Sequence, residues 1–236
     1  MMPRSLAGQS EAELGGGHSV LVLQRRDHRA LDALLARIDG SSGDERAGAL
    51  TDLCRLVFPH AFAEEAVLWP VLRRVLPDGH ELTLRVEQEH QEINELFTVL
   101  ETLEVDGTEH HRLFTRIEQL LRADVRDEED ELLPKLQTVM EPQALRRLGW
   151  AWQVVRSTAP TRPHPVVARR LPGNALAALP LAPIDRSRDR LDRAARRVPG
   201  RWAAGCRTAS RALATAAGAI EHLPPLRRGE HPSTRA

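Results

Sequence analysis

Residues 60–70 read HAFAEEAVLWP, and the same pattern returns 64 positions later as DVRDEEDELLP, residues 124–134. Each copy places two acidic residues at the fourth and fifth positions after its first residue, and a proline at the tenth. The first residues differ, because His60 opens one copy and Asp124 opens the other. Three explanations are open here: a metal site that has lost a ligand, a metal site with a substituted ligand, or two acidic helices that are alike by accident.

A second repeated pattern precedes each of these copies. DHRALDALL, residues 27–35, matches EHQEINELF, residues 89–97, and this alignment places His28 and His90 62 positions apart. The chain is therefore predicted to consist of two similar halves. In each half, a helix with one histidine is followed by a helix with a pair of candidate donors.

The donor pairs are spaced to share one face of a helix. Residues i and i+4 lie about 6 Å apart along the helix axis. His60 with Glu64, and Asp124 with Glu128, therefore each direct two donor groups the same way. Mixed nitrogen and oxygen donors without thiolate suit iron or manganese, and zinc is compatible with them. The complete candidate metal-ligand set is His28, His60, Glu64, His90, Asp124 and Glu128.

The apolar residues recur with helical periodicity, and no segment alternates with a period of two. We therefore predict an all-α fold, an up-down-up-down four-helix bundle that brings the donors around one axis. Pro59, Pro70 and Pro134 fall inside predicted helices and should bend or locally unwind them. The predicted helices span residues 19–39, 44–76, 79–105, 109–139 and 142–155.

The formal charge divides the chain. Residues 1–155 carry a net charge of −11 and residues 156–236 a net charge of +11, within a total of zero. We divide the chain into a disordered N-terminus (1–17), a bundle (18–155), and a Pro-rich linker with a basic helical extension (156–236). Helices are predicted at 184–198 and 201–223. Three interpretations of the basic extension remain open: it docks on its own acidic bundle, it contacts an anionic membrane surface or nucleic acid, or it binds a partner.

Composition argues against several classes of protein. Four phenylalanines, four tryptophans and no tyrosine provide little for base stacking, so no specific nucleic-acid binding is expected. Cys54 and Cys206 form no C-x-x-C motif, which is typical of a reducing compartment. No secretory signal and no apolar run of about 18 residues is visible, so we expect a cytoplasmic protein without a transmembrane segment.

Simpler explanations apply to each residue taken alone. A single histidine on an apolar helix face is more often a core or rim residue than a ligand, and DVRDEEDE could form a solvated acidic face. Three histidines in register with two acidic pairs favour a metal site. Glu65 and Glu129 are interpreted as surface groups or as groups behind the ligands, and a bridging role is the remaining alternative. His80, His110 and His111 are interpreted as solvated residues at helix starts.

The chain resembles the hemerythrin-like, or HHE cation-binding, domains over roughly residues 20–152. The resemblance is carried by RRDHRALDALL, FPHAFAEEAVLWPVL, VEQEHQEINELF, DVRDEEDELLPKL and LRRLGWAW. The segment from Ala159 to Asp189 is also similar to the C-terminal extension of Arg-rich actinobacterial members. The resemblance implies a four-helix bundle with a non-haem di-iron centre that handles oxygen, peroxide or nitric oxide. Five of the six candidate ligands fall on family ligand positions, whereas Asp124 falls where the family has histidine.

The expected function is therefore that of a di-iron-binding, oxygen-handling protein. If it turns over a substrate, iron is the chemical agent, and whether it is an enzyme stays open, as does its oligomeric state. The alternatives are an iron-responsive regulatory module whose tail contacts a partner, and a metal-free structural bundle. The basic extension is compatible with peripheral membrane contact.

Overall fold

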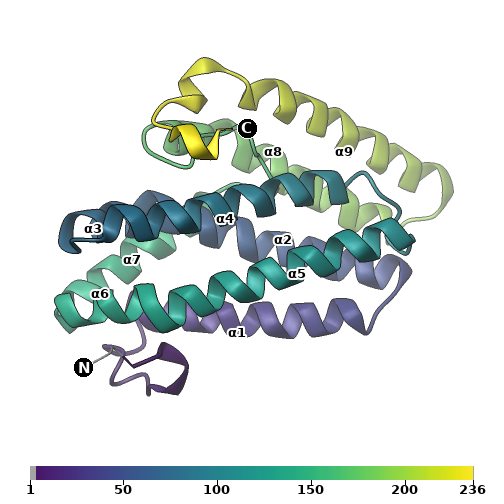
Figure 1. Cartoon of the computed structure of the whole chain (residues 1–236). Helices are drawn as coiled ribbons and strands as arrows, with labels where there is room; N and C mark the ends of the chain where they lie inside the picture. Colours follow the sequence, from purple (N-terminus) through teal and green to yellow (C-terminus); the bar gives the residue numbers. More distant parts are fainter. Residues whose placement is uncertain (1–3, 236) are drawn as a thin grey trace.

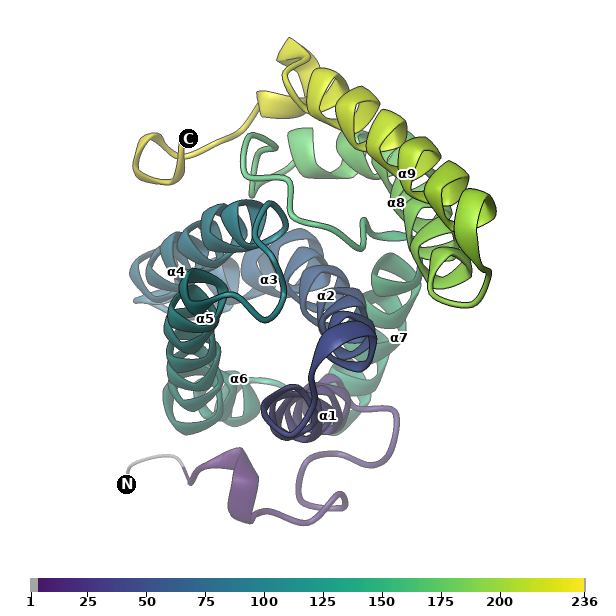
Figure 2. The ribbon, with the colours of Figure 1, turned by 90° about the vertical axis from the view of Figure 1, so that its right-hand side faces the viewer.

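The computed structural model describes residues 4–235, and these residues form helices and connecting segments without a strand (Figure 1). Viewed along the bundle, four long helices surround one axis (Figure 2). The predicted all-α class and helical bundle are confirmed. The four helices are α1 (Val20–Asp39), α2 (Gly43–Ala63), α4 (Gly79–Leu100) and α5 (Thr108–Asp127).

Two of these helices continue through a π-helical turn into a further α-helix. Helix α2 passes through Glu64–Leu68 into α3 (Trp69–Val75), and α5 passes through Glu128–Leu132 into α6 (Leu133–Val139). Helix α7 (Pro142–Thr158) follows, with its proline at the first helical position as predicted.

Each π-helical turn directly precedes one of the repeated prolines. The Trp69 N–H donates to the Glu64 carbonyl, five residues back, and Pro70 then has no N–H to donate. The Leu133 N–H donates to the Glu128 carbonyl in the same way before Pro134. The prolines thus unwind their helices locally, as predicted, and widen the turn that carries the acidic pair. Pro59, by contrast, lies within the continuous helix α2.

The core consists of two apolar clusters, and the candidate donors occupy the layer between them. One cluster surrounds Trp69 and Trp152, and the other surrounds Phe58, Phe97 and Phe114. Along α1, for example, the first cluster ends at Leu23 and the second begins at Leu31, with His28 between them. The polar layer is therefore closed off by apolar side chains along the bundle axis.

The N-terminal segment corrects one prediction. We expected residues 1–17 to be disordered; residues 1–3 lie outside the described part of the chain, and residues 4–17 pack against the bundle. Leu6 and Leu14 are fully buried in the cluster around Trp69. The Arg25 guanidinium, itself buried, donates to the Leu6 carbonyl at 3.2 Å. Two isolated leucines in a polar, Gly-rich stretch show no periodicity, which is why the sequence did not indicate this packing.

The C-terminal extension corrects a second prediction. Helix α8 begins at Gly173 and ends at Ala195, so residues 173–183 are helical where we expected an irregular linker. Pro180 and Pro183 lie inside α8, and the acceptors they leave unbonded belong to Leu176 and Leu179. Both leucines are exposed, so water can bond to their carbonyl groups. Helix α9 (Gly200–Glu221) packs against α8, close to the predicted 201–223.

Residues 159–172, here called the strap, connect α7 to α8 across the bundle (Figure 2). Arginines of the extension bind acidic groups of the bundle: Arg162 to Glu101 at 2.9 Å and Arg170 to Glu87 at 2.7 Å. These contacts support the interpretation in which the basic extension docks on its own bundle. No helix in the described part of the chain is long and apolar enough to cross a membrane.

Candidate metal centre

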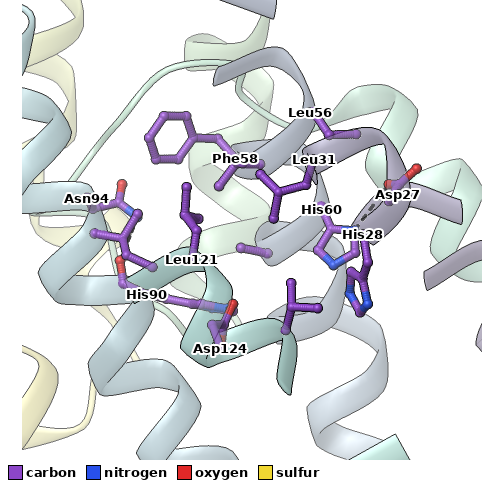
Figure 3. A pocket seen from close by; sticks show the side chains of 14 residues that line it. Asp27, His28, Leu31, Leu56, Phe58, His60, His90, Asn94, Leu121 and Asp124 are labelled. Atoms are coloured by element: carbon purple, nitrogen blue, oxygen red, sulfur yellow. Dashed lines mark hydrogen bonds and ion pairs between the residues drawn. The ribbon is translucent and has the colours of Figure 1, made fainter. Parts of the chain in front are cut away.

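The structure brings all six candidate ligands into the polar layer between the two apolar clusters. Figure 3 shows four of them, His28, His60, His90 and Asp124. Ligand atoms of His28, His60, Glu64 and Glu128 lie within 4.8 Å of one another. Ligand atoms of His90, Asp124 and Glu128 form a second group by the same measure. Glu128 belongs to both groups, so the arrangement offers two adjacent cation positions with one shared carboxylate.

Inner atoms of four of the six candidate ligands are buried and have no hydrogen-bond partner among residues 4–235. These atoms are the His28 Nε2, both carboxylate oxygens of Glu64 and of Glu128, and the Asp124 Oδ1. His28 Nε2 lies 3.2 Å from Glu128 Oε2, yet the two atoms are not aligned for a hydrogen bond. Buried polar atoms are normally paired. Several unpaired ligand atoms that converge on one place are suited to coordinate bound cations.

The outer nitrogen of each histidine is held by a carboxylate. The His28 Nδ1 contacts Glu129 at 2.8 Å and the His90 Nδ1 contacts Glu65 at 3.0 Å. The His60 Nδ1 contacts Asp27 at 3.1 Å. Each contact leaves Nε2 directed inward and makes it a better electron donor, as the outer partners of metal-bound histidines do.

The π-helical turns explain why two consecutive acidic residues are both buried. Glu64 and Glu128 point inward, while the following residues, Glu65 and Glu129, hold a histidine of another helix. For Glu65 and Glu129, the structure supports groups behind the ligands rather than surface groups or bridging groups.

The two halves differ at Asp124. The symmetry that relates His60 to Asp124 also relates Asp27 to Glu89. Where Asp27 contacts an imidazole, Glu89 faces another carboxylate. The Glu89 Oε2 is buried and has no hydrogen-bond partner in the described part of the chain. Burial and the neighbouring charge of Asp124 raise the pKa of Glu89 to about 7. One half of the site therefore carries an excess of negative charge.

The carboxylates hold protons on the histidines of the metal-free protein. Burial lowers the pKa of His28, but Glu128 and Glu129 outweigh it and raise the pKa to about 9. Burial also lowers the pKa of His60, but Glu64 and Asp27 outweigh it and raise the pKa to about 10. Burial and the charge of Glu64 raise the pKa of Glu128 to about 8. A cation that binds here must displace these protons.

Sequence reasoning missed some of the surrounding groups. Asp27 was not proposed for a role, although the repeated acid-histidine dipeptides, Asp27-His28 and Glu89-His90, were a signal for it. His110, expected in solvent, is buried, whereas His80 and His111 are exposed. His164 packs in the strap, and its Nε2 lies 3.1 Å from Asp185.

Comparison with known proteins agrees with this geometry. The sequence model of the hemerythrin HHE cation-binding domain matches residues 20–136. Residues 20–136 belong to the hemerythrin-like family. An uncharacterized hemerythrin-like protein of Schizosaccharomyces pombe is 22% identical over 174 residues, which cover 71% of this chain and 84% of that protein. No solved structure matches the chain.

The family assignment covers the part of this hemerythrin-like protein that contains all six candidate ligands. The match with the yeast protein is longer than residues 1–155 and therefore includes some of the extension. The likeness supports a cation-binding role for the bundle. It leaves the identity of the cation, and any role of the extension, to the chemistry of the residues themselves.

Proposed function

We propose that this hemerythrin-like protein holds a non-haem di-iron centre between α1, α2, α4 and α5 and acts on oxygen, peroxide or nitric oxide. The observation that carries the proposal is the set of converging, unpaired inner atoms whose outer nitrogens are fixed by carboxylates. Three imidazoles and three carboxylates suit iron, and manganese or zinc would accept the same donors. The ligands would be His28, His60, Glu64, His90, Asp124 and Glu128.

Two groups of donors with a shared carboxylate support two ions rather than one. Glu128 lies in both groups, and Glu64 approaches both His60 at 3.0 Å and His90 at 3.7 Å. Two glutamates that reach toward donors of different helices would hold both ions, as in other carboxylate bundles. Bound iron would supply the redox chemistry, while the chain positions the donors and controls access.

A small apolar chamber adjoins the donors on the side of the Phe58 cluster (Figure 3). Its volume is about 30 Å³, and its walls include Leu31, Phe58, Ile93 and Leu121. A cavity of roughly 15 Å³ suffices for one water, so this chamber has room for a diatomic molecule or peroxide beside the donors. Its largely apolar walls favour an uncharged ligand.

Asp124 directs the proposal toward an oxidised centre. A carboxylate in place of an imidazole adds one negative charge next to His90, at 3.7 Å. Negative charge stabilises ferric over ferrous iron. Reversible oxygen carriage requires a persistent ferrous pair, so peroxide chemistry or iron sensing fits this centre better than oxygen storage.

The test uses Asp124→Ala and Asp124→His after anaerobic reconstitution with ferrous iron. We expect elemental analysis to find roughly two ions per wild-type chain and about one in Asp124→Ala. Asp124→His should keep both ions and prolong any oxygen adduct seen in the visible spectrum after mixing with air. Asp127→Ala is the matched control, because Asp127 lies one turn further on and pairs with Arg85 at the surface.

Two results would refute parts of this proposal. A wild-type protein that takes up no metal would be a structural bundle, in which the histidine–carboxylate pairs serve stability alone. Unchanged metal content and spectrum in Asp124→Ala would show that Asp124 is no ligand.

A further inference from the structure

The surroundings of the two symmetry-related histidines differ in one respect that the repeated sequence does not show. Glu129, which holds His28, forms no ion pair with an arginine or lysine among residues 4–235. Glu65, which holds His90, has the guanidinium of Arg169 near it, with 3.8 Å between Arg169 Nη1 and Glu65 Oε1. The Glu65 oxygen that contacts Arg169 is the same one that contacts the His90 Nδ1.

Arg169 belongs to the strap and is buried. Its Nη2 donates to the His164 carbonyl at 2.9 Å, and its backbone N–H donates to the Glu230 carboxylate. The Asn174 side chain donates to its carbonyl at 3.1 Å. These contacts fix the backbone and one arm of the guanidinium, so the other arm faces Glu65. A guanidinium that is buried and fixed in this way is screened little by solvent.

The strap docks on the helix that carries His90. The His164 N–H donates to Asn94 Oδ1 at 3.0 Å, and Asn94 Nδ2 donates to the His90 carbonyl at 3.0 Å. Gln91 donates to the Pro165 carbonyl at 3.0 Å. Gln91 and Asn94 therefore fix the place where the strap contacts α4. The position of Arg169 along α4 follows from this contact.

We propose that Arg169 is a positioning residue for the second cation position, the one formed by His90, Asp124 and Glu128. Its guanidinium holds Glu65 against His90 and offsets part of the negative charge that Asp124 and Glu89 place in this half. The C-terminal extension is thereby part of the metal centre and more than a cover for the bundle. This inference rests on the proposed function, since it requires that cations bind between the helices.

The experiment titrates the metal-free full-length protein with Co²⁺, whose visible absorption reports each coordinated ion, in competition with a chelator. The wild type should bind two ions. Arg169→Gln should bind the first ion normally and the second about 10–100-fold more weakly, as changes behind a metal ligand typically do. Arg169→Lys keeps the charge and should recover most of the affinity. Arg170→Gln is the control, because Arg170 lies next in the strap but pairs with Glu87.

A double substitution separates an action through Glu65 from general loosening of the strap. If Arg169 acts through Glu65, Arg169→Gln should cause no further loss in a Glu65→Gln background. Equal second-ion affinity in the wild type and Arg169→Gln would overturn the inference while the proposed function stands. Additive losses in the double variant, or the same loss in Arg170→Gln, would overturn it as well. A wild type that binds no cobalt would refute the proposed function itself, and this inference with it.

Discussion

Asp27 and Glu89 occupy equivalent places in the two halves, yet neutralising them should change stability in opposite directions. Asp27 accepts a hydrogen bond from His60 and pairs with Arg156 at 2.8 Å. Glu89 faces the charge of Asp124 and has a buried oxygen without a partner. Glu89→Gln removes a repulsive charge and adds an amide that can donate to Asp124, whereas Asp27→Asn removes an attractive one.

The size of the effect follows from the pKa of Glu89, which burial and Asp124 raise from 4.5 to about 7. At full weight this rise corresponds to roughly 3 kcal/mol at pH 8, where the carboxyl is ionised in both states. Glu89 is partly exposed. Solvent screening therefore reduces the expected gain in unfolding free energy to about 1–2 kcal/mol. Asp27→Asn should lose about 1–3 kcal/mol, because it removes the negative charge that pairs with His60 and Arg156.

The stability gained in Glu89→Gln also depends on pH. The raised pKa means that the folded state carries no cost from Glu89 below about pH 4.5 and the full cost above pH 7. The advantage of Glu89→Gln should therefore grow between pH 5 and pH 8. Urea unfolding of the metal-free protein at both values measures it. A Glu89→Gln variant that is no more stable than the wild type at pH 8 would show that Glu89 and Asp124 do not repel each other in the folded protein.

Two further predictions concern protons and the π-helical turns. The pKa values of His28 and His60 are raised to about 9 and about 10, so between about pH 7 and pH 10 the metal-free folded chain binds more protons than the unfolded chain. Its unfolding free energy, measured by urea titration, should therefore fall as the pH rises through this range. Bound metal should reduce this pH dependence. Pro134→Ala restores an N–H and permits a regular α-helical register in place of the π-helical turn. It should weaken cobalt binding about tenfold or more without lowering the unfolding free energy. Pro180→Ala in α8 is the control and should leave cobalt binding unchanged.

The sequence predicted the bundle and its donors because both depend on short-range spacing. Apolar residues at helical intervals mark the buried face of each helix, and pairs such as His60 and Glu64 share a face whatever the rest of the chain does. The sequence repeat then gave the donors of the second half, because the residues proposed in the first half have counterparts at the matching positions of the second. The six candidate donors were named on this basis, and the structure places them together.

Contacts that depend on how separate segments meet could not be predicted in this way. The pairing of Glu129 with His28 spans 101 residues, and that of Gln9 with Gln137 spans 128. No local spacing encodes such distances along the chain. The same limit applies to Leu6 and Leu14, whose burial depends on a surface formed by α1 and the later helices. The first half of helix α8, residues 173–183, was missed for a different reason. Two prolines signal a helix break, but this signal does not tell which face of the helix meets water.

The substitution at position 124 is best understood together with the groups around it. Replacing an imidazole by a carboxylate removes the partner of Glu89 and leaves two acidic groups where the other half has an ion pair. The same half is the one that the strap covers, and the strap carries a buried guanidinium toward Glu65, on the far side of His90 from Asp124. His90 therefore lies between an added negative charge and an added positive one. In the other half, the strap does not cover Glu129, the carboxylate that holds His28. Among the described residues, no arginine or lysine pairs with Glu129. A dead ligand position would need no such counter-charge. The placement of Arg169 is thus an argument that the carboxylate at position 124 is used at the cation position.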